Sequence, residues 1–350
     1  MREVAAEVAA WRAAGERVAL ATVIGVTGSA PRPVGATLAA TGGSRMAGSV
    51  SNGCVEAAVY EECMAALDAN SARVVHYGIS DELAFTVGLS CGGAIDVLVE
   101  PLGPLHERAL EAVRADRAAV LARVTAPAER AGTIGLVTED GSAVEWGARL
   151  ATIAADAQAA LRDGRSRTVA LGDGAIFLEA LPAAPTLVII GATHAAVALA
   201  RLAKVIGYRV VVADPRKALA SRERFPDADE LLHLWPDAAF ARLRVTDRTA
   251  VVLLSHDPKF DRPGLLAALR SAAGYIGAIG SRRTNEERLD WLRAQGVAQH
   301  AIERLHAPIG LDIGAATAEE IALSILAEIV ASTRGRAGAS LSARSLAAVG

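Results

Sequence analysis

The chain has 350 residues, with 36 Lys and Arg against 39 Asp and Glu and a formal net charge of -3. This balance excludes the strongly basic surface typical of proteins that bind nucleic acid or an anionic membrane. Aromatic residues make up only 4%, too few to favour a stacking platform for single strands, whereas the 52% of hydrophobic residues can form a large core. The length suits two domains of about 100–200 residues each.

The three cysteines and the N-terminal residues bear on the cell compartment. An odd, small number of cysteines does not form a disulfide framework and indicates a reducing compartment. Residues 1–16 alternate charged residues with alanine at helical spacing, which is unlike a signal peptide. Apolar runs stay at strand length, well short of the roughly 20 residues that span a bilayer. We therefore expect a cytoplasmic protein that has no membrane partner.

The first half of the chain predicts an α+β domain over residues 1–182. Apolar residues at helical spacing predict a helix up to about residue 15 and another over residues 53–68. Residues 104–181 are expected to form one helix followed by several strands. Earlier strands are expected over residues 17–26, 35–40, 45–50, 73–77 and 94–99.

The second half has a different pattern and predicts a Rossmann-like, doubly wound parallel-sheet domain over residues 185–332. A linker, Pro182-Ala-Ala-Pro185, precedes it, and the β-branched run over residues 186–190 is typical of a strand covered on both faces. Strands and helices then alternate, which favours a parallel sheet. Further strands are expected over 208–213, 250–254 and 275–279, and helices over 194–206, 265–273, 284–295 and 318–332. Residues 333–350 predict a flexible tail.

The turn after the first of these strands has the position of a dinucleotide-binding fingerprint. Gly191 permits a tight turn, Ala196 suits the third position of the motif, and Asp214 lies near the distance expected for a ribose-binding acid. The middle glycine, however, is Thr193, whose branched side chain crowds a pyrophosphate. The amides of the helix start still favour an anion. An ordinary turn without a ligand is the alternative, and His194 fits a solvated or capping role.

Other loops follow strands of the same expected sheet and therefore lie at its carboxyl edge, where ligands bind in this architecture. Arg216 suits a phosphate, with a local salt bridge as the alternative. Ser255-His256-Asp257 is not a catalytic triad, because adjacent residues do not point at one another. Gly277 to Arg283 brings small residues, a hydroxyl and two cations, and Pro308 to Gly314 forms a further glycine loop. We expect these loops to converge on one crevice.

Two cysteines lie in glycine-rich loops of the first half. Cys54 lies where a helix is expected to begin, and a helix N-terminus favours the thiolate. Cys91 lies between Ser90 and two glycines, whereas Cys63 falls on the apolar face of a helix. Burial as small hydrophobic residues is the alternative for both loop cysteines. Zinc is poorly supported, and ligation of a soft metal or transfer of sulfur suits two accessible thiols. His76 and Glu56 are the candidate bases for a nucleophilic cysteine.

These strings in this order resemble the XdhC/CoxI family over about residues 17–332. The resemblance rests on Gly28-Ser-Ala-Pro-Arg-Pro, Gly48-Ser-Val-Ser-Asn-Gly-Cys-Val-Glu, Gly88-Leu-Ser-Cys-Gly-Gly, Val212-Ala-Asp-Pro-Arg, Leu254-Ser-His-Asp and Gly277-Ala-Ile-Gly-Ser-Arg. Two positions depart from the family pattern: Asn52 stands where many members have Gly, and Thr193-His194 where many have Gly-His. The second departure argues against a normal NAD site.

The resemblance implies an accessory factor of xanthine dehydrogenase, not an enzyme. Such a factor binds and protects the molybdenum cofactor, assists its sulfuration by a cysteine desulfurase and delivers it to a molybdenum hydroxylase; members are often homodimers. NAD is not expected. Metal contact is implied for Cys54 and Cys91. The residues expected to bind the cofactor are Ser51, Gly53, Cys54, Cys91, Gly92, Gly191, Thr193, His194, Asp214, Arg216, His256, Gly280, Ser281 and Arg282.

Two other functions stay open at this point. The first is an NAD(P)-dependent oxidoreductase, in which Asp214 takes the ribose hydroxyls and His256 acts as the acid–base residue. Micromolar NAD binding would favour it. The second is a protein that binds another nucleotide or docks a partner without chemistry, for which replacement of both loop cysteines leaves function intact.

Overall fold

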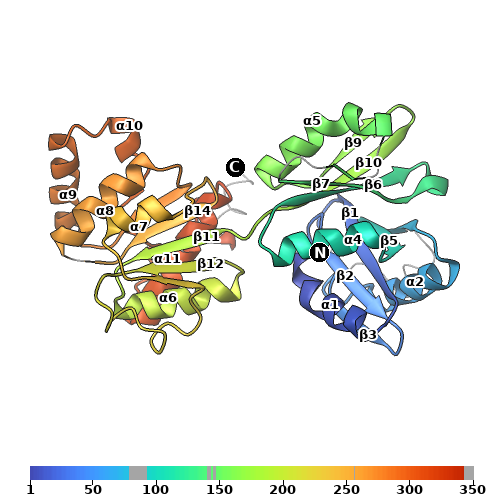
Figure 1. Cartoon of the computed structure of the whole chain (residues 1–350), viewed down its shortest axis with the longest axis horizontal. Coiled ribbons are helices and arrows are strands. Elements are labelled where there is room, and N and C mark those ends of the chain that lie inside the picture. Colours follow the sequence, from blue (N-terminus) through green and yellow to red (C-terminus); the bar gives the residue numbers. More distant parts are fainter. Residues whose placement is uncertain (79–92, 140–142, 145–146, 256, 343–350) are drawn as a thin grey trace. The chain divides into compact units, whose positions relative to one another are not determined.

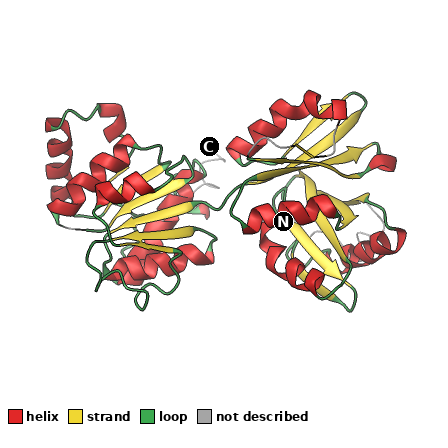
Figure 2. Ribbon diagram, viewed as in Figure 1, coloured by secondary structure: helices red, strands yellow, loops and turns green. Residues whose placement is uncertain are grey.

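The computed structural model describes residues 1–78, 93–139, 143–144, 147–255 and 257–342. The chain divides into two compact units, unit 1 over Met1–Ala183 and unit 2 over Ala184–Gly350. Figure 1 labels the elements of both units, and Figure 2 distinguishes their helices from their strands. Each unit is described by itself.

The first sheet of unit 1 is antiparallel and has the strand order β3-β2-β1-β5-β4. Helix α2 (Glu56–Ala69) packs on one face through the apolar residues Val59, Cys63 and Ala66, which recur at helical spacing. Its strands are β1 (Val18–Thr27), β2 (Thr37–Thr41), β3 (Arg45–Gly48), β4 (Arg73–Tyr77) and β5 (Ala94–Pro101).

The second sheet of unit 1 is also antiparallel, with the order β8-β7-β6-β10-β9. Helix α1 (Ala5–Ala13), which follows the 3-10 turn η1 (Arg2–Val4), and α4 (Pro104–Arg114) share a core with both sheets. Helix α5 (Gly147–Asp163) packs against the second sheet in a separate core. The strands are β6 (Ala119–Ala126), β7 (Gly132–Thr138), β8 (Ala143–Val144), β9 (Arg167–Leu171) and β10 (Gly174–Leu181), and η2 (Ala128–Arg130) precedes β7.

A buried group of charges links the two sheets of unit 1. Arg123 of β6 has no exposed surface; its Nε lies 2.7 Å from Oε1 of Glu100 and its Nη1 lies 2.5 Å from Oε2 of Glu179. The buried His106 lies 3.1 Å from the same Glu100 oxygen, and the amine of Met1 lies 3.3 Å from Glu179. Burial raises the pKa of Glu179, but Arg123 and the amine outweigh it, so the pKa is lowered.

Unit 2 is a six-stranded parallel sheet with the order β13-β12-β11-β14-β15-β16. Counted from β11 this order is 3-2-1-4-5-6, that of the Rossmann fold, and helices cover both faces (Figure 2). The strands are β11 (Thr186–Ile190), β12 (Arg209–Ala213), β13 (Glu230–Leu232), β14 (Thr249–Leu253), β15 (Tyr275–Ala278) and β16 (Leu305–His306).

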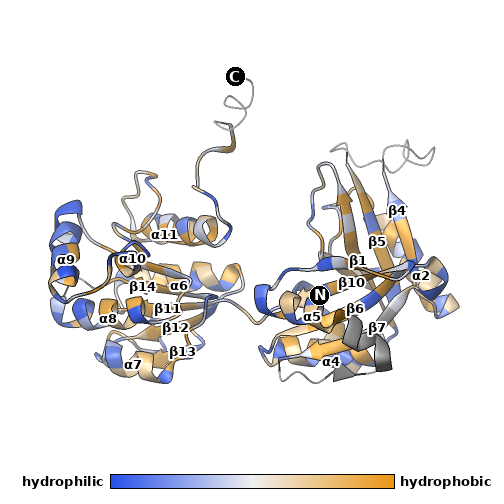
Figure 3. Ribbon diagram, turned by 90° about the horizontal axis from the view of Figure 1, so that it is seen from above, coloured by the Kyte–Doolittle hydropathy of each residue, from blue (hydrophilic) through white to orange (hydrophobic). Residues whose placement is uncertain are grey.

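Two separate cores on opposite faces of this sheet hold its helices. Helices α6 (His194–Val205) and α11 (Ala318–Thr333) share one core, because alternate strand residues such as Leu187 and Ile189 point to that face. The other core includes Val188 and Ile190 and holds α7 (Pro236–Arg242), α8 (Pro258–Arg270), α9 (Arg282–Ala294) and α10 (Gln299–Ile302). Figure 3 colours much of α9 as hydrophilic, because its sequence is rich in charged residues.

The α/β fold class with an N-terminal α+β part and a C-terminal Rossmann-like part is confirmed, with three corrections to the elements. Helix α5 lies within a stretch where the sequence predicted strands after a single helix. Strands β13 and β16 and helices α7 and α10 were not predicted. Helix α8 begins at Pro258 instead of 265, because Asp257 caps it by accepting from the Lys259 amide at 2.9 Å. The predicted tail lies partly outside the described residues.

Candidate functional site

The loop over residues 49–54 in unit 1 is organised by one carboxylate. Oε1 of Glu56 accepts from the Ser49 hydroxyl at 2.6 Å and from the amides of Val50 and Ser51 at 3.2 and 2.8 Å. Oε2 accepts from the Ser51 hydroxyl at 2.5 Å and the Gly53 amide at 2.8 Å. Burial raises the pKa of Glu56, but these donors outweigh it and lower the pKa to about 2. Both oxygens of the carboxylate are engaged by the loop, which disfavours Glu56 as a general base.

The backbone of this loop needs residues that tolerate positive φ. Asn52 has φ 58° and Gly53 has φ 110°, and the neighbouring Gly48 has φ 73°. Asn is the residue after Gly that most readily adopts the left-handed region, which explains how Asn52 fits this position. Gly48 has a second constraint, since a Cβ there would overlap the carbonyl oxygen of Thr37.

The loop that contains Gly28 to Pro33 lies against the loop over residues 49–54. Nδ2 of Asn52 donates to the Pro31 carbonyl at 3.3 Å, and Nε of Arg32 donates to the Ser49 carbonyl at 3.3 Å. Gly93 lies directly beside this loop, because a Cβ there would overlap the carbonyl oxygen of Ser29. The chain at Gly93 therefore enters β5 at the same end of the sheet as the loops over residues 28–33 and 49–54.

Of the two loop cysteines, the structure describes Cys54 only. Cys54 is half-buried and packs against the core beneath α2, two residues before the helix begins. Cys91 and Gly92 lie outside the described residues. Cys63 is fully buried, and burial raises the pKa of its thiol to about 12, which fits an unreactive core position. His76 is exposed, and its Nδ1 lies 2.7 Å from Asp96.

In unit 2, the Gly191 turn meets the loop after β14 at the point where the strand order reverses. Gly191 has φ 101°, and a Cβ there would lie 3.1 Å from the amide nitrogen of Ser255. The adjacent amide of Ala192 donates to Asp214 at 2.9 Å. This is the place where open α/β sheets bind ligands. His256 lies outside the described residues.

Asp214 is buried and bound to its own loop. Its Oδ1 accepts from Nε and the amide of Arg216, both at 2.9 Å, and its Oδ2 accepts from Nη2 of Arg216 at 2.6 Å and from Ala192. Burial raises the pKa of Asp214, and these hydrogen bonds outweigh it and lower the pKa. With both oxygens engaged and no exposed surface, this carboxylate is poorly placed to bind ribose hydroxyls. The salt-bridge alternative for Arg216 is the one observed.

The remaining edge residues cap helices. Thr193 is the N-cap of α6, and its hydroxyl accepts from the Ala196 amide at 3.3 Å, whereas His194 is exposed at the first helical position. Ser281 is the N-cap of α9 and accepts from the Thr284 amide at 3.1 Å. Arg282 is exposed beside it, and Gly280 has φ 147°. The hydroxyls of Thr193 and Ser281, which were expected to bind an anion, therefore cap the first turns of α6 and α9.

The predicted site residues thus fall into two groups. Ser51, Gly53 and Cys54 lie together in unit 1, and the described edge residues lie along the carboxyl ends of β11, β12 and β15 in unit 2. Sequence reasoning missed the clamping role of Glu56, although a Glu three residues after Gly53 has the spacing of a capping box. It also missed Trp235 and Phe260, which follow strands β13 and β14.

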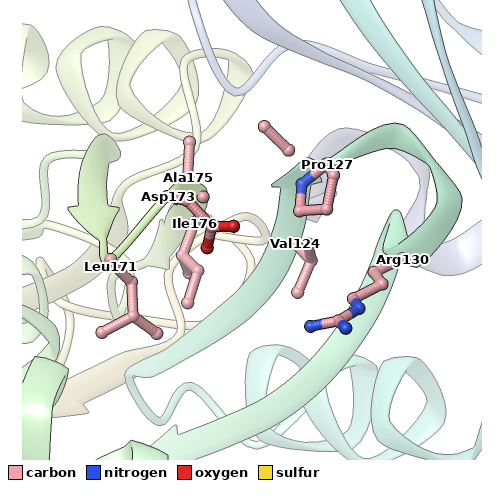
Figure 4. A pocket seen from close by; sticks show the side chains of 10 residues that line it. Val124, Pro127, Arg130, Leu171, Asp173, Ala175 and Ile176 are labelled. Atoms are coloured by element: carbon pink, nitrogen blue, oxygen red, sulfur yellow. The ribbon is translucent and has the colours of Figure 1, made fainter.

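A pocket of about 360 Å³ lies elsewhere in unit 1, between the ends of β6, β9 and β10 (Figure 4). Val124, Leu171 and Ile176 form apolar walls, and Arg130 and Asp173 also line it. None of the predicted site residues that the structure describes contributes to it. Among the described residues, no group of three or more His, Cys, Asp and Glu side chains is placed to hold a metal ion. In the same part of the chain, no helix has both the length and the apolar character to cross a membrane.

We expect Asp214→Asn to lower the free energy of unfolding of unit 2 by about 1–3 kcal/mol, because the charge-assisted hydrogen bonds to Arg216 and Ala192 are weakened. Urea denaturation followed by circular dichroism measures this loss. Asp290→Asn is the matched control, since Asp290 is exposed and pairs only at the surface with Arg293. Equal stability of the two variants would contradict a structural role of Asp214.

The geometry defines a two-unit protein in which a glycine-rich cysteine loop and a Rossmann unit occur in one chain. Family models agree: the XdhC and CoxI family matches residues 11–78, and the XdhC Rossmann domain matches residues 187–329. A relative described as the molybdenum cofactor insertion chaperone PaoD, from Escherichia coli strain K12, is 30% identical over 316 residues, which cover 90% of this chain and 83% of that protein. The chain belongs to the XdhC and CoxI family.

Two further similarities have the same extent. A relative from Bacillus subtilis strain 168, described as a probable xanthine dehydrogenase subunit, is 28% identical over 324 residues, which cover 90% of this chain and 93% of the relative. A crystal structure described as a xanthine dehydrogenase from Bacillus halodurans superimposes with a TM-score of 0.77 at 23% identity, covering 96% of this chain and 98% of that one. The latter shows a shared fold over nearly the whole chain.

Proposed function

We propose that this protein is an accessory factor that binds the molybdenum cofactor as cargo, assists its sulfuration and delivers it to a molybdenum hydroxylase of the xanthine dehydrogenase class. Membership of the family and the similarity to a molybdenum cofactor insertion chaperone support this role. We further infer that a cysteine desulfurase supplies the sulfur and that the protein acts in the cytoplasm as a homodimer, as a carrier instead of an enzyme.

The observation that carries the proposal is the ordered loop around Cys54. Glu56 fixes the loop through five hydrogen bonds to its hydroxyls and amides, and the half-buried Cys54 follows at its end. A preorganised loop lowers the entropy lost when a ligand binds. A cysteine sulfur suits a soft metal, so we assign Cys54 to the metal end of the cargo, together with Cys91.

The residues of unit 2 have a second role in this proposal. Amides at the start of α6 and the cations at the carboxyl edge suit the phosphate of the cofactor's pterin part. The proposed cofactor-binding residues of this edge are Gly191, Thr193, His194, Arg216, His256, Gly280, Ser281 and Arg282, with Asp214 holding Arg216 in position. The same ion pair disfavours the oxidoreductase alternative, because Arg216 already binds the Asp214 carboxylate that the ribose of NAD would need.

We expect Cys54→Ala to lose most of the cofactor that the wild-type protein retains. The protein is incubated with the cofactor and passed through a desalting column, and molybdenum is measured by mass spectrometry and the pterin by fluorescence after oxidation. Cys63→Ala is the matched control, because it removes a cysteine that is fully buried in the core. Retention by Cys54→Ala equal to that of the control would remove Cys54 from the site and overturn the proposal for this loop.

A further inference from the structure

Trp235 and Arg216, from two carboxyl-edge segments of unit 2, each lie over the ring of Phe260 from a third segment. Phe260, in the first turn of α8, lies 4.6 Å from Trp235 between ring centroids, with the rings inclined by 13°. The guanidinium carbon of Arg216 lies 5.0 Å from the centre of the Phe260 ring. Arg216 follows β12, Trp235 follows β13 and Phe260 follows β14, so the stack lies at the edge where this architecture binds ligands.

The outer member of this stack is exposed. Phe260 is 7% exposed, as expected for a ring in a core, whereas Trp235 is 48% exposed although it is one of only four tryptophans in the chain. Trp235 is also the N-cap of α7, with Pro236 as the next residue, so the backbone that carries it is restrained. A ring held in this way loses little conformational freedom when another ring stacks on it.

Arg216 is held in a fixed orientation beside the rings. Its Nε and Nη2 donate to Asp214, and a planar guanidinium with these two donors engaged presents Nη1 on the side away from that carboxylate. The side chain is 46% exposed. Asp237, Asp257, Lys217 and Lys259 occur on the same segments, so acidic and basic residues are equal in number there.

We propose that Trp235 and Arg216 form a subsite for a flat heteroaromatic ring that bears a phosphate. The ring stacks on the exposed part of Trp235, and the phosphate accepts from Nη1 of Arg216. Trp235 and Arg216 both lie against the same Phe260 ring, at 4.6 and 5.0 Å from its centre. A pterin phosphate and a nucleoside monophosphate share this chemistry. That the natural ligand is the pterin phosphate rests on the proposed function.

Isothermal titration calorimetry of the full-length protein with a pterin phosphate, with cytidine and adenosine monophosphates, and with inorganic phosphate tests the subsite. We expect at least one ring ligand to bind more tightly than phosphate, and Trp235→Ala to weaken that binding about tenfold, since base stacking on an aromatic ring contributes an effect of this order. Trp291→Ala is the matched control, because Trp291 of α9 packs under Arg262 of α8. Trp235→Phe, which keeps a smaller ring, should lose only about threefold.

The outcomes separate this proposal from the role of Cys54. Binding of the pterin phosphate alone or of a nucleotide alone supports the subsite and identifies the source of the ring. Unchanged binding by Trp235→Ala, or no ring ligand binding better than phosphate, overturns it and leaves Trp235 to a protein contact. If Cys54→Ala loses the cofactor and no ring ligand binds, the carrier role stands and the subsite fails. If a ring ligand binds and Cys54→Ala retains all of the cofactor, the subsite stands and the role of Cys54 fails.

Discussion

Arg123→Met is expected to lower the free energy of unfolding of unit 1 by about 3–5 kcal/mol, the largest loss that we predict for a single residue. The substitution keeps much of the side-chain volume but removes the cation that lies between Glu100 and Glu179. The carboxylates of Glu100 and Glu179, which have almost no exposed surface, then lack the cation between them. Burying such charges without a partner raises the free energy of the folded state. Chemical denaturation, monitored by circular dichroism, measures the change.

The control for this prediction is Arg114→Met, which makes the same substitution at an exposed position at the end of α4. It should change stability by less than about 0.5 kcal/mol. Adding Glu179→Gln to Arg123→Met should restore part of the loss, because it removes one of the charges left behind. A loss from Arg123→Met as small as that from the control would show that the buried charges do not hold the two sheets together.

Glu56→Ala is expected to lower the stability of unit 1 by about 2–4 kcal/mol and to reduce cofactor retention as strongly as Cys54→Ala. The reason is that five donors of the loop, including the hydroxyls of Ser49 and Ser51, lose their acceptor at once. Denaturation and the desalting assay measure the two effects. Glu61→Ala, which removes an exposed carboxylate from the same helix, is the control and should change neither.

The pH dependence of this effect has a definite sign. The pKa of Glu56 is lowered in the folded protein to about 2 from an ordinary value of 4.5. Its contribution to stability, about 2 kcal/mol after allowance for solvent screening, is therefore fully present above about pH 4.5 and lost as the pH falls toward 2. The difference in stability between wild type and Glu56→Gln should shrink over that range. A difference that stays constant from pH 6 to 3 would contradict the assignment.

Local sequence patterns determined the regular elements of unit 2. The apolar run over residues 186–190 and its counterparts became strands within one or two residues of their expected bounds, because a strand covered on both faces needs a continuous apolar sequence. The same patterns failed where the signal was weak. Helix α5 is rich in alanine, and its described buried residues Ile153, Ala157 and Ala160 give little contrast between faces. Strand β13 spans only Glu230–Leu232, too short for a period to register.

The candidate site divides in a similar way. Its glycines and cysteines were recognisable from order and spacing along the chain, and the fold of the family followed from them. The hydrogen-bond partners of the charged residues were not recognisable from the sequence. Glu56 and Asp214 differ from exposed acidic residues only through the donors that folding brings to them. The stack of Arg216, Phe260 and Trp235 likewise joins three segments that are distant in sequence.

The sequence by itself therefore determined the family, the two kinds of fold and the positions of the glycine-rich loops, because these depend on local conformation and on which residues must be buried. The tertiary structure alone showed that Glu56 clamps its loop and that Asp214 binds Arg216. The donors lie close to each carboxylate in the sequence, but only the folded loop shows that they point at it.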